Sequence, residues 1–294
     1  MAEDLRFGLF LGQGGSDWGA MLDRFQMADE LGFDHAWLVD HFVDTDGDLR
    51  RSCLEAWTLL AGLAARTSRI RLGILVSSNT YRHPSLLAKE AVTVDHISGG
   101  RLTLGLGTGW YEPEHRMYGF PFPAAPERVD RLQEAVEIVK DLTRQERTTF
   151  HGRHYRLDDA PFEPKPVQRP GIPLLIAAHR PRMLRLAARY ADVWDTFPSV
   201  PGAATEGIEE DVAQRMRRFE GYCREAGRDP REVRRSTWTG GGALESEDAF
   251  LAFVNPNRAL GFTDFSTGLP SEPHMDAARR IATEVIPALK AGTA

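Results

Sequence analysis

The sequence RLTLGLGTGW, residues 101–110, resembles a β-strand that ends in glycines, and the rest of the chain is interpreted around it. Its leucines alternate with smaller residues at the period of two that is typical of a strand. Gly107 and Gly109 allow the backbone to turn sharply and to approach a flat ligand closely. Two interpretations are open for this stretch alone. Either a ligand lies at the end of the strand, or the strand packs against a large neighbour.

Strand-like and helix-like segments alternate along the remaining sequence. The strand candidates are residues 5–12, 33–40, 69–78, 101–109, 174–178, 191–196, 233–239 and 262–267. The helix candidates are residues 17–31, 52–66, 84–97, 128–142, 182–190, 206–226, 248–260 and 275–291. Eight such units predict an α/β protein whose 294 residues form one (β/α)8 TIM barrel domain. The alternative is an open doubly wound sheet, but the GxGxxG spacing typical of that fold is absent here.

Residues 145–172 interrupt the alternation. They contain a hairpin-like sequence, TTFHGRHYRL, followed by the proline-rich PFEPKPVQRPGIP. So many prolines exclude a helix and a central strand. We therefore expect an insertion that wraps the rim of the barrel.

The overall composition is that of an ordinary globular protein, 42% hydrophobic and 27% charged. A net charge of −6 argues against nucleic-acid or anionic-membrane partners, and no apolar run reaches the ~20 residues of a membrane span. The N-terminal residues lack the pattern of a secretion signal, and Cys53 and Cys223 have no paired spacing. We therefore expect a cytoplasmic protein whose partner is a small molecule.

Polar residues follow several strand candidates, and in a barrel the carboxyl ends of the strands surround one site. Asp40 and His41 are the clearest pair, because a histidine beside a carboxylate suits proton transfer. The alternative is a surface or capping histidine. Adjacent strand residues point to opposite faces, so the two need not contact each other. The other candidate residues are Gln13, Ser77, Ser78, Asn79, Gly107, Thr108, Gly109, Trp110, Tyr111, Ala177, Ala178, His179 and Arg180.

These side chains suit two further uses. A metal site would need several ligands aimed at one point, and its only candidates are Asp40, His41, His179 and Asp195. No strand has the HxH spacing that would support it, so we predict no metal. Arg180 and Arg182 lie near a helix start, where they could meet an anionic cofactor tail.

Four segments resemble the bacterial luciferase-like family of flavin and deazaflavin oxidoreductases. They are WLVDHF (37–42), RHPSLLAKEAVTVDHISGGRLTLGLGTGW (82–110), the hairpin with PKPVQRPGIPLLI (150–176) and LRLAARYADVW (184–194). The resemblance implies a (β/α)8 barrel that binds FMN or coenzyme F420 at the carboxyl ends of its strands. The Asp-His pair is similar to that of the deazaflavin branch. It implies that Asp40 and His41 hold the cofactor and that His41 donates or accepts the proton.

The resemblance also implies how the other candidates act. A non-prolyl cis peptide at Val76–Ser77 or Ser77–Ser78 would press on the ring, and residues 77–79 would contact the cofactor. Residues 107–109 would accept the ring or its ribityl chain. Residues 177–180 stand where the family usually has glycines that bind phosphate, and Pro181 has no N–H to offer. Gln13, Trp110 and Tyr111 would contact substrate, and relatives commonly form homodimers.

The expected function is an F420-dependent oxidoreductase that moves a hydride between a deazaflavin and a small organic substrate. An FMN-dependent monooxygenase is the first alternative. A non-catalytic barrel that has lost its cofactor is the second, and the altered 177–181 run motivates it.

Overall fold

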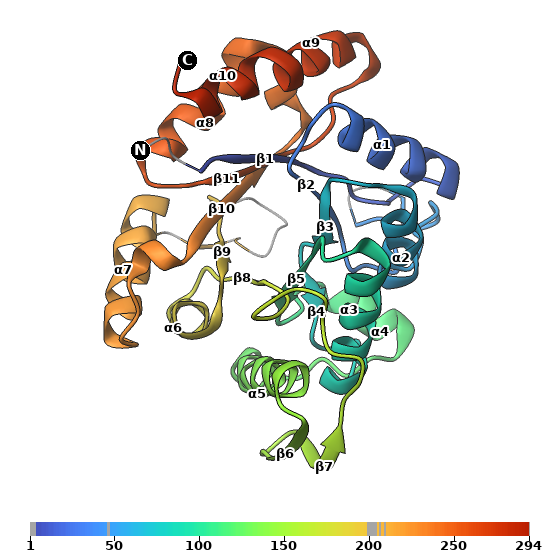
Figure 1. The fold of residues 1–294 in the computed structure, drawn as a ribbon, viewed down its shortest axis with the longest axis vertical. Helices are drawn as coiled ribbons and strands as arrows, with labels where there is room; N and C mark the ends of the chain where they lie inside the picture. Colours follow the sequence, from blue (N-terminus) through green and yellow to red (C-terminus); the bar gives the residue numbers. More distant parts are fainter. Residues whose placement is uncertain (1–3, 46–47, 199–204, 206, 209, 294) are drawn as a thin grey trace.

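The structure is a computed structural model that describes residues 4–45, 48–198, 205, 207–208 and 210–293 (Figure 1). The strands are β1 (Arg6–Phe10), β2 (His35–Leu38), β3 (Arg71–Ile74), β4 (Ser77–Ser78), β5 (Leu102–Gly107), β6 (Arg147–His151), β7 (Arg156–Pro161), β8 (Leu174–Ala177), β9 (Val193–Asp195), β10 (Arg234–Thr239) and β11 (Asp264–Thr267). The α-helices are α1 (Trp18–Glu30), α2 (Ala56–Arg66), α3 (Pro84–Ser98), α4 (Glu112–Tyr118), α5 (Ala125–Arg144), α6 (Pro181–Tyr190), α7 (Val212–Glu225), α8 (Glu247–Ala259), α9 (Met275–Arg280) and α10 (Ile286–Ala291).

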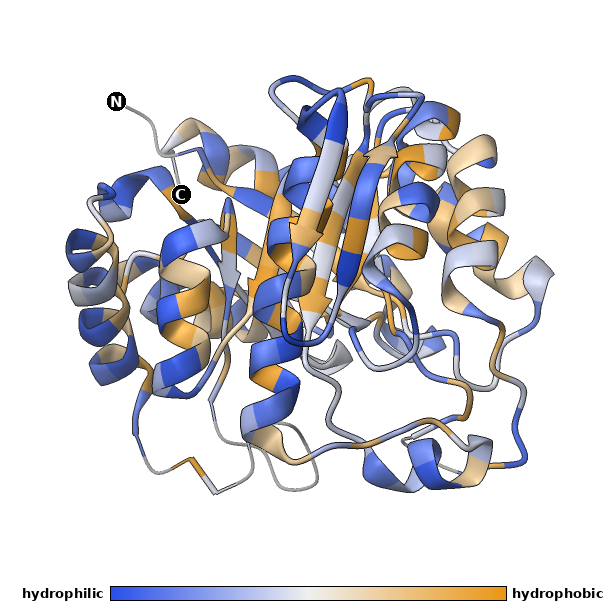
Figure 2. Ribbon diagram, turned by 90° about the horizontal axis from the view of Figure 1, so that it is seen from below, coloured by the Kyte–Doolittle hydropathy of each residue, from blue (hydrophilic) through white to orange (hydrophobic). Residues whose placement is uncertain are grey.

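Parallel strands close into a barrel. They follow the order β3-β2-β1-β11-β10-β9-β8-β5, and β5 pairs back with β3. The helices form the outer layer in Figure 1, and Figure 2 shows hydrophobic colour on the strands and on the helix faces turned toward them. The predicted (β/α)8 TIM barrel is confirmed. In the part of the chain that the structure describes, no helix is both long and apolar enough to cross a membrane.

The glycines of β5 pack against the neighbouring strand region. A Cβ atom on Gly105 would lie 2.1 Å from the carbonyl oxygen of Ile74, and one on Gly107 would lie 2.4 Å from Cγ2 of Val76. The interpretation that this strand packs against a large neighbour is therefore correct for these two positions. Gly109 has a φ of 77°, in the left-handed region that favours glycine, so it makes the turn that leaves the strand.

The third strand candidate, residues 69–78, is interrupted in the structure. β3 ends at Ile74 and β4 begins at Ser77, and the non-prolyl cis peptide joins Leu75 to Val76 in the gap. The sequence analysis placed that bond at Val76–Ser77 or Ser77–Ser78, which is wrong by one or two residues. The apolar run RIRLGILV carries no residue that marks the interruption.

The insertion at residues 145–172 takes a different course from the one predicted. β6 and β7 form a hairpin that projects beyond α5, and the following prolines run along the outside of α3 (Figure 1). Asn79 Nδ2 donates to the Tyr155 hydroxyl at 3.3 Å near the strand ends, whereas Gln168 Nε2 donates to the carbonyl of Leu102 at the start of β5. The segment therefore runs from one end of the barrel to the other and does not wrap the rim.

Two helices differ from the prediction. α4 was missed, because it is short and follows the glycines without a clear apolar period. The helix expected at 206–226 begins at Val212, after Asp211, whose side chain accepts from the Gln214 N–H as an N-cap. Residues 206 and 209 lie outside the described residues.

Candidate active site

A cavity of about 900 Å³ lies at the carboxyl ends of the barrel strands. His41 follows β2 and Gly107 ends β5, and both line this cavity although the strands are separated by β3. The predicted site residues on its wall are Asp40, His41, Ser78, Gly107, Thr108, Gly109, Trp110, Tyr111, Ala177, His179 and Arg180. The chain thus brings most of the strand-end candidates to one place.

His41 is held by a residue that the sequence analysis missed. Its Nδ1 atom lies 2.8 Å from Oε2 of Glu114, a fully buried residue at the start of α4. The other carboxylate oxygen accepts the backbone N–H groups of Phe42 and Val43. Because Glu114 binds Nδ1, the imidazole is fixed in orientation and Nε2 remains as the nitrogen for a ligand.

The charge of Glu114 is stabilised within this cluster. Burial would raise the pKa of Glu114, but hydrogen bonds from His41, Tyr81 and the backbone of Phe42 outweigh that effect and lower it. The Tyr81 hydroxyl donates to Oε2, and burial together with that hydrogen bond raises the pKa of Tyr81. Glu114 is therefore an anion, and its Oε2 atom can accept a hydrogen bond from the Nδ1–H group of His41.

Asp40 does not pair with His41. Its Oδ2 atom accepts from Nη1 of Arg82 at 2.7 Å and from the backbone N–H of Ser78 at 2.8 Å. Arg82 also pairs with Glu55 and Glu90. Asp40 thus connects the end of β2 to β4 and α3, although it also lines the cavity.

Three arginines, Arg128, Arg180 and Arg182, line the cavity near the start of α6. Arg182 pairs with Asp130, whereas within the described part of the chain no acid pairs with Arg180. Arg180 precedes Pro181, which occupies a first-turn position where its missing N–H costs no hydrogen bond. The run that lacks the expected glycines therefore places Arg180 on the cavity wall.

His179 is a partly buried residue of the cavity wall. Its Nδ1 atom lies 3.0 Å from Oγ1 of Thr196, and its ring makes an edge contact with Phe197. Burial and the positive charges of Arg215 and Arg180 lower the pKa of His179 to about 3. The imidazole is therefore neutral at physiological pH.

Four predicted site residues do not line the cavity. Gln13 is fully buried, and its amide bonds the backbone of Val39 and Leu54, so its position does not support the predicted substrate contact. Asn79 turns its Nδ2 to Tyr155 in the hairpin. Ser77 and Ala178 are fully buried beside the wall rather than on it.

The four candidate metal ligands are not gathered together. Among the residues described, no three histidine, cysteine, aspartate or glutamate side chains form a group that could hold an ion. Asp40 is paired with Arg82, and His41 with Glu114.

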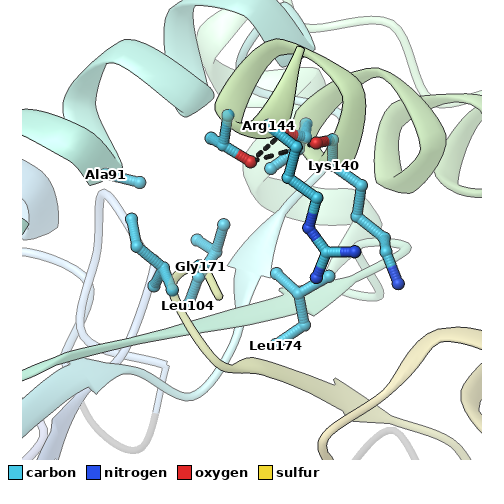
Figure 3. A pocket seen from close by; sticks show the side chains of 9 residues that line it. Ala91, Leu104, Lys140, Arg144, Gly171 and Leu174 are labelled. Carbon is cyan, nitrogen blue, oxygen red and sulfur yellow. Dashed lines mark hydrogen bonds between the residues drawn. The ribbon is translucent and has the colours of Figure 1, made fainter. Parts of the chain in front are cut away.

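A second, much smaller gap lies outside the barrel, between α3, α5 and strands β5 and β8. Figure 3 shows the side chains of Lys140 and Arg144 beside it, together with Ala91 and Leu174. Its volume is about 10 Å³, at the lower limit of the ~10–15 Å³ that one water molecule needs. It is a packing defect rather than a second binding site.

The sequence is similar to one protein family and to several curated proteins. The sequence model of the family described as luciferase-like monooxygenase matches residues 5–240. An F420-dependent glucose-6-phosphate dehydrogenase of Microbacterium testaceum is 36% identical over 199 residues, 67% of this chain and 57% of that protein. The enzyme of the same name from Kineococcus radiotolerans is 36% identical over 178 residues, 59% of this chain and 51% of that one. The match thus spans just over half the length of these relatives.

Solved structures with the same fold have lower identity. An F420-dependent secondary alcohol dehydrogenase in complex with an F420-acetone adduct matches with a TM-score of 0.82 at 20% identity, covering 97% of this chain and 99% of that one. The F420-dependent tetrahydromethanopterin reductase of Methanopyrus kandleri matches with a TM-score of 0.80, also at 20% identity, over 97% of this chain and 99% of that one. These likenesses establish the fold.

Proposed function

Because the chain belongs to the luciferase-like monooxygenase family, we propose that it is an F420-dependent oxidoreductase that transfers a hydride between the deazaflavin and a small organic substrate. The observation that carries the proposal is the His41–Glu114 pair, in which His41 lies on the wall of a large cavity that residues 107–109 also line. Relatives at 36% identity bear F420-dependent names, which favours the deazaflavin over FMN.

The residues present fit a flat ring with an anionic tail. The cavity of about 900 Å³ falls within the range of cofactor sites, and part of its wall is apolar and aromatic. Arg180 is available for the tail at the cavity edge, since no acid in the described part of the chain pairs with it. Residues 107–109 would lie along the ring, and Trp110 at the mouth would cover it.

When bound, the deazaflavin supplies the carbon that gives or takes the hydride. The protein supplies the proton path. His41 Nε2 accepts a proton from, or returns one to, the oxygen of the substrate, while Glu114 holds Nδ1 and stabilises the imidazolium that forms. Val76 and Tyr111 line the same cavity and exclude water from the reacting groups.

A direct titration tests this proposal. The purified full chain is titrated with F420 and separately with FMN, and binding is followed by quenching of the ring fluorescence. We expect F420 to bind at least tenfold more tightly than FMN. Tighter binding of FMN would support the monooxygenase alternative, and binding of neither would support a barrel without a cofactor; both results contradict the proposal.

A further inference from the structure

The carboxyl group of Asp195 also lies on the cavity wall, across the barrel from His41. Asp195 ends β9, pairs in register with Ala177 of β8 and Ser236 of β10, and is 1% exposed. Its Oδ1 atom accepts a hydrogen bond from the Ser236 hydroxyl at 2.8 Å. Its Oδ2 atom is buried and has no hydrogen-bond partner. A buried polar atom normally has a partner, so the unpartnered Oδ2 of Asp195 calls for an explanation.

Among the residues that the structure describes, no cation pairs with this carboxyl group. On β10, Arg234 pairs with Asp264 and Asp4, and Arg235 pairs with Glu220. On β11, Asp264 adds negative charge.

The helices beside β9 do not supply a cation either. Arg215 of α7 donates to the Thr196 hydroxyl and the Phe197 carbonyl, and His179, between β8 and α6, is neutral. Burial, reinforced by Asp264, raises the pKa of Asp195 to about 7. The carboxyl group is therefore largely protonated in weakly acidic solution.

The hydrogen-bond pattern places the proton. Because Oδ1 accepts from Ser236, it is the carbonyl oxygen of the neutral acid, and Oδ2 is the hydroxyl oxygen that donates. The wall around it is aromatic. Phe10 stacks on Trp238 with ring centroids 4.7 Å apart, and Phe197 contacts the same indole at 4.7 Å. This surface suits a flat or apolar ligand that carries one uncharged hydrogen-bond acceptor within reach of Oδ2.

We propose that Asp195 is a ligand-binding residue whose neutral carboxyl group donates a hydrogen bond from Oδ2 to a carbonyl oxygen of the molecule in the cavity. The inference rests on the proposed function and deepens it. Two sources could supply that carbonyl group, the deazaflavin ring or a carbonyl-bearing substrate.

The test compares wild type with Asp195→Asn and Asp195→Leu. Asn keeps a donor at this position and cannot ionise, whereas Leu has the same branching at Cγ and no donor. Titrations with F420 at pH 6.5 and pH 8 follow ring fluorescence. If the ring is the partner, the Asp195→Leu variant binds F420 at least tenfold more weakly, and Asp195→Asn binds within about threefold of wild type at pH 6.5. Relative to Asp195→Asn, wild type loses about tenfold in affinity between the two pH values, since only its neutral form donates.

A second titration adds cyclohexanone to protein saturated with F420, and detects binding by the change in ring fluorescence. If the substrate is the partner, Asp195→Leu lowers the affinity for cyclohexanone and leaves the affinity for F420 unchanged. Should Asp195→Leu fail to fold, as judged by thermal unfolding, the pH dependence of wild type against Asp195→Asn decides in its place.

The outcomes separate this inference from the proposed function. Wild type that binds neither F420 nor FMN contradicts both. Two results would contradict only the role of Asp195 if wild type binds F420. One is that Asp195→Leu has wild-type affinity in both titrations. The other is that the affinities of wild type and Asp195→Asn depend on pH in the same way in both titrations.

Discussion

Glu114 changes how the Asp40-His41 sequence is understood. The adjacent acid is paired with Arg82, and the acid that contacts His41 comes from 73 residues further along the chain. Hydrogen bonds from His41, Tyr81 and two backbone N–H groups hold Glu114. Glu114 is therefore a positioning residue, and His41 is the group that would meet a ligand.

His41→Ala should cut turnover by about 10²–10⁴-fold, the usual contribution of a general acid or base, while F420 affinity changes little. Turnover is measured as loss of F420 absorbance with a substrate found by screening alcohols and other hydroxy compounds. Steady-state turnover equal to that of wild type would exclude His41 from the chemistry.

Glu114→Gln should lower turnover by about tenfold and shift the pH profile of kcat, because an amide orients His41 less firmly and does not stabilise its charge. Its F420 dissociation constant should stay within about threefold of wild type. Tyr81→Phe is the matched control, since it removes one hydrogen bond to the same Oε2 and leaves the contact with His41. A kcat profile unchanged in Glu114→Gln would refute the positioning role.

At the level of elements, β5 and the segment around β3 and β4 shape one side of the cavity. The alternation and glycines of residues 101–109 predicted the strand correctly, and the interpretation that a ligand lies at its end stays a prediction. Gly105 and Gly107 allow close packing against Ile74 and Val76, and residues 107–109 also line the cavity.

Gly107→Ala should destabilise the protein by about 1–3 kcal/mol, because the new Cβ would lie 2.4 Å from Cγ2 of Val76. It should also weaken F420 binding, since Val76 lines the cavity. Gly221→Ala in α7 is the control, because no atom lies within 4 Å of its added Cβ, and it should stabilise by about 0.5–1 kcal/mol. Denaturant unfolding measures both, and equal stabilities of the two variants would contradict the packing argument.

The segment along α3 is held by Asp95, which is fully buried. Its carboxylate accepts the Val167 N–H at 2.7 Å and Gln168 Nε2 at 2.7 Å. Asp95→Ala leaves these donors unpaired and should cost about 3 kcal/mol of unfolding free energy. Thr93→Ala, at an exposed position of the same helix, should cost less than about 0.5 kcal/mol. A loss for Asp95→Ala no larger than that of Thr93→Ala would show that the segment does not depend on this carboxylate.

For the whole molecule, the barrel interior contains a neutral histidine that contributes to the acid dependence of stability. His35 is buried, lies 2.9 Å from the Ser266 hydroxyl, and has its pKa lowered to about 3 by burial and nearby arginines. Its folded pKa is below the unfolded value, so the unfolded state binds more protons between about pH 6.5 and pH 3. Stability should therefore fall as the pH falls through this window.

Urea unfolding between pH 7 and pH 4 tests this expectation. His35→Gln removes the titrating group and should give a shallower loss of stability with acid. His151→Gln, at an exposed hairpin position, should leave the pH dependence close to that of wild type. An identical dependence in His35→Gln and wild type would contradict the role of His35.

The sequence predicted the barrel well because alternation, glycines and prolines are local signals. It failed where the determinant was distant in the chain. Glu114 contacts His41 only after β2 and α4 are brought together, and the interruption between Ile74 and Ser77 depends on how β3 and β4 pair with β5. The course of the proline-rich segment follows from Asp95, whose partners lie more than 70 residues away.

The central claim is that His41 and residues 107–109 enclose one planar redox ring. A crystal structure of the protein soaked with F420 tests it most directly. We expect the ring between the His41 imidazole and residues 107–109, with the anionic tail at Arg180. A ring bound outside this cavity, or one separated from His41 by protein side chains, would contradict it.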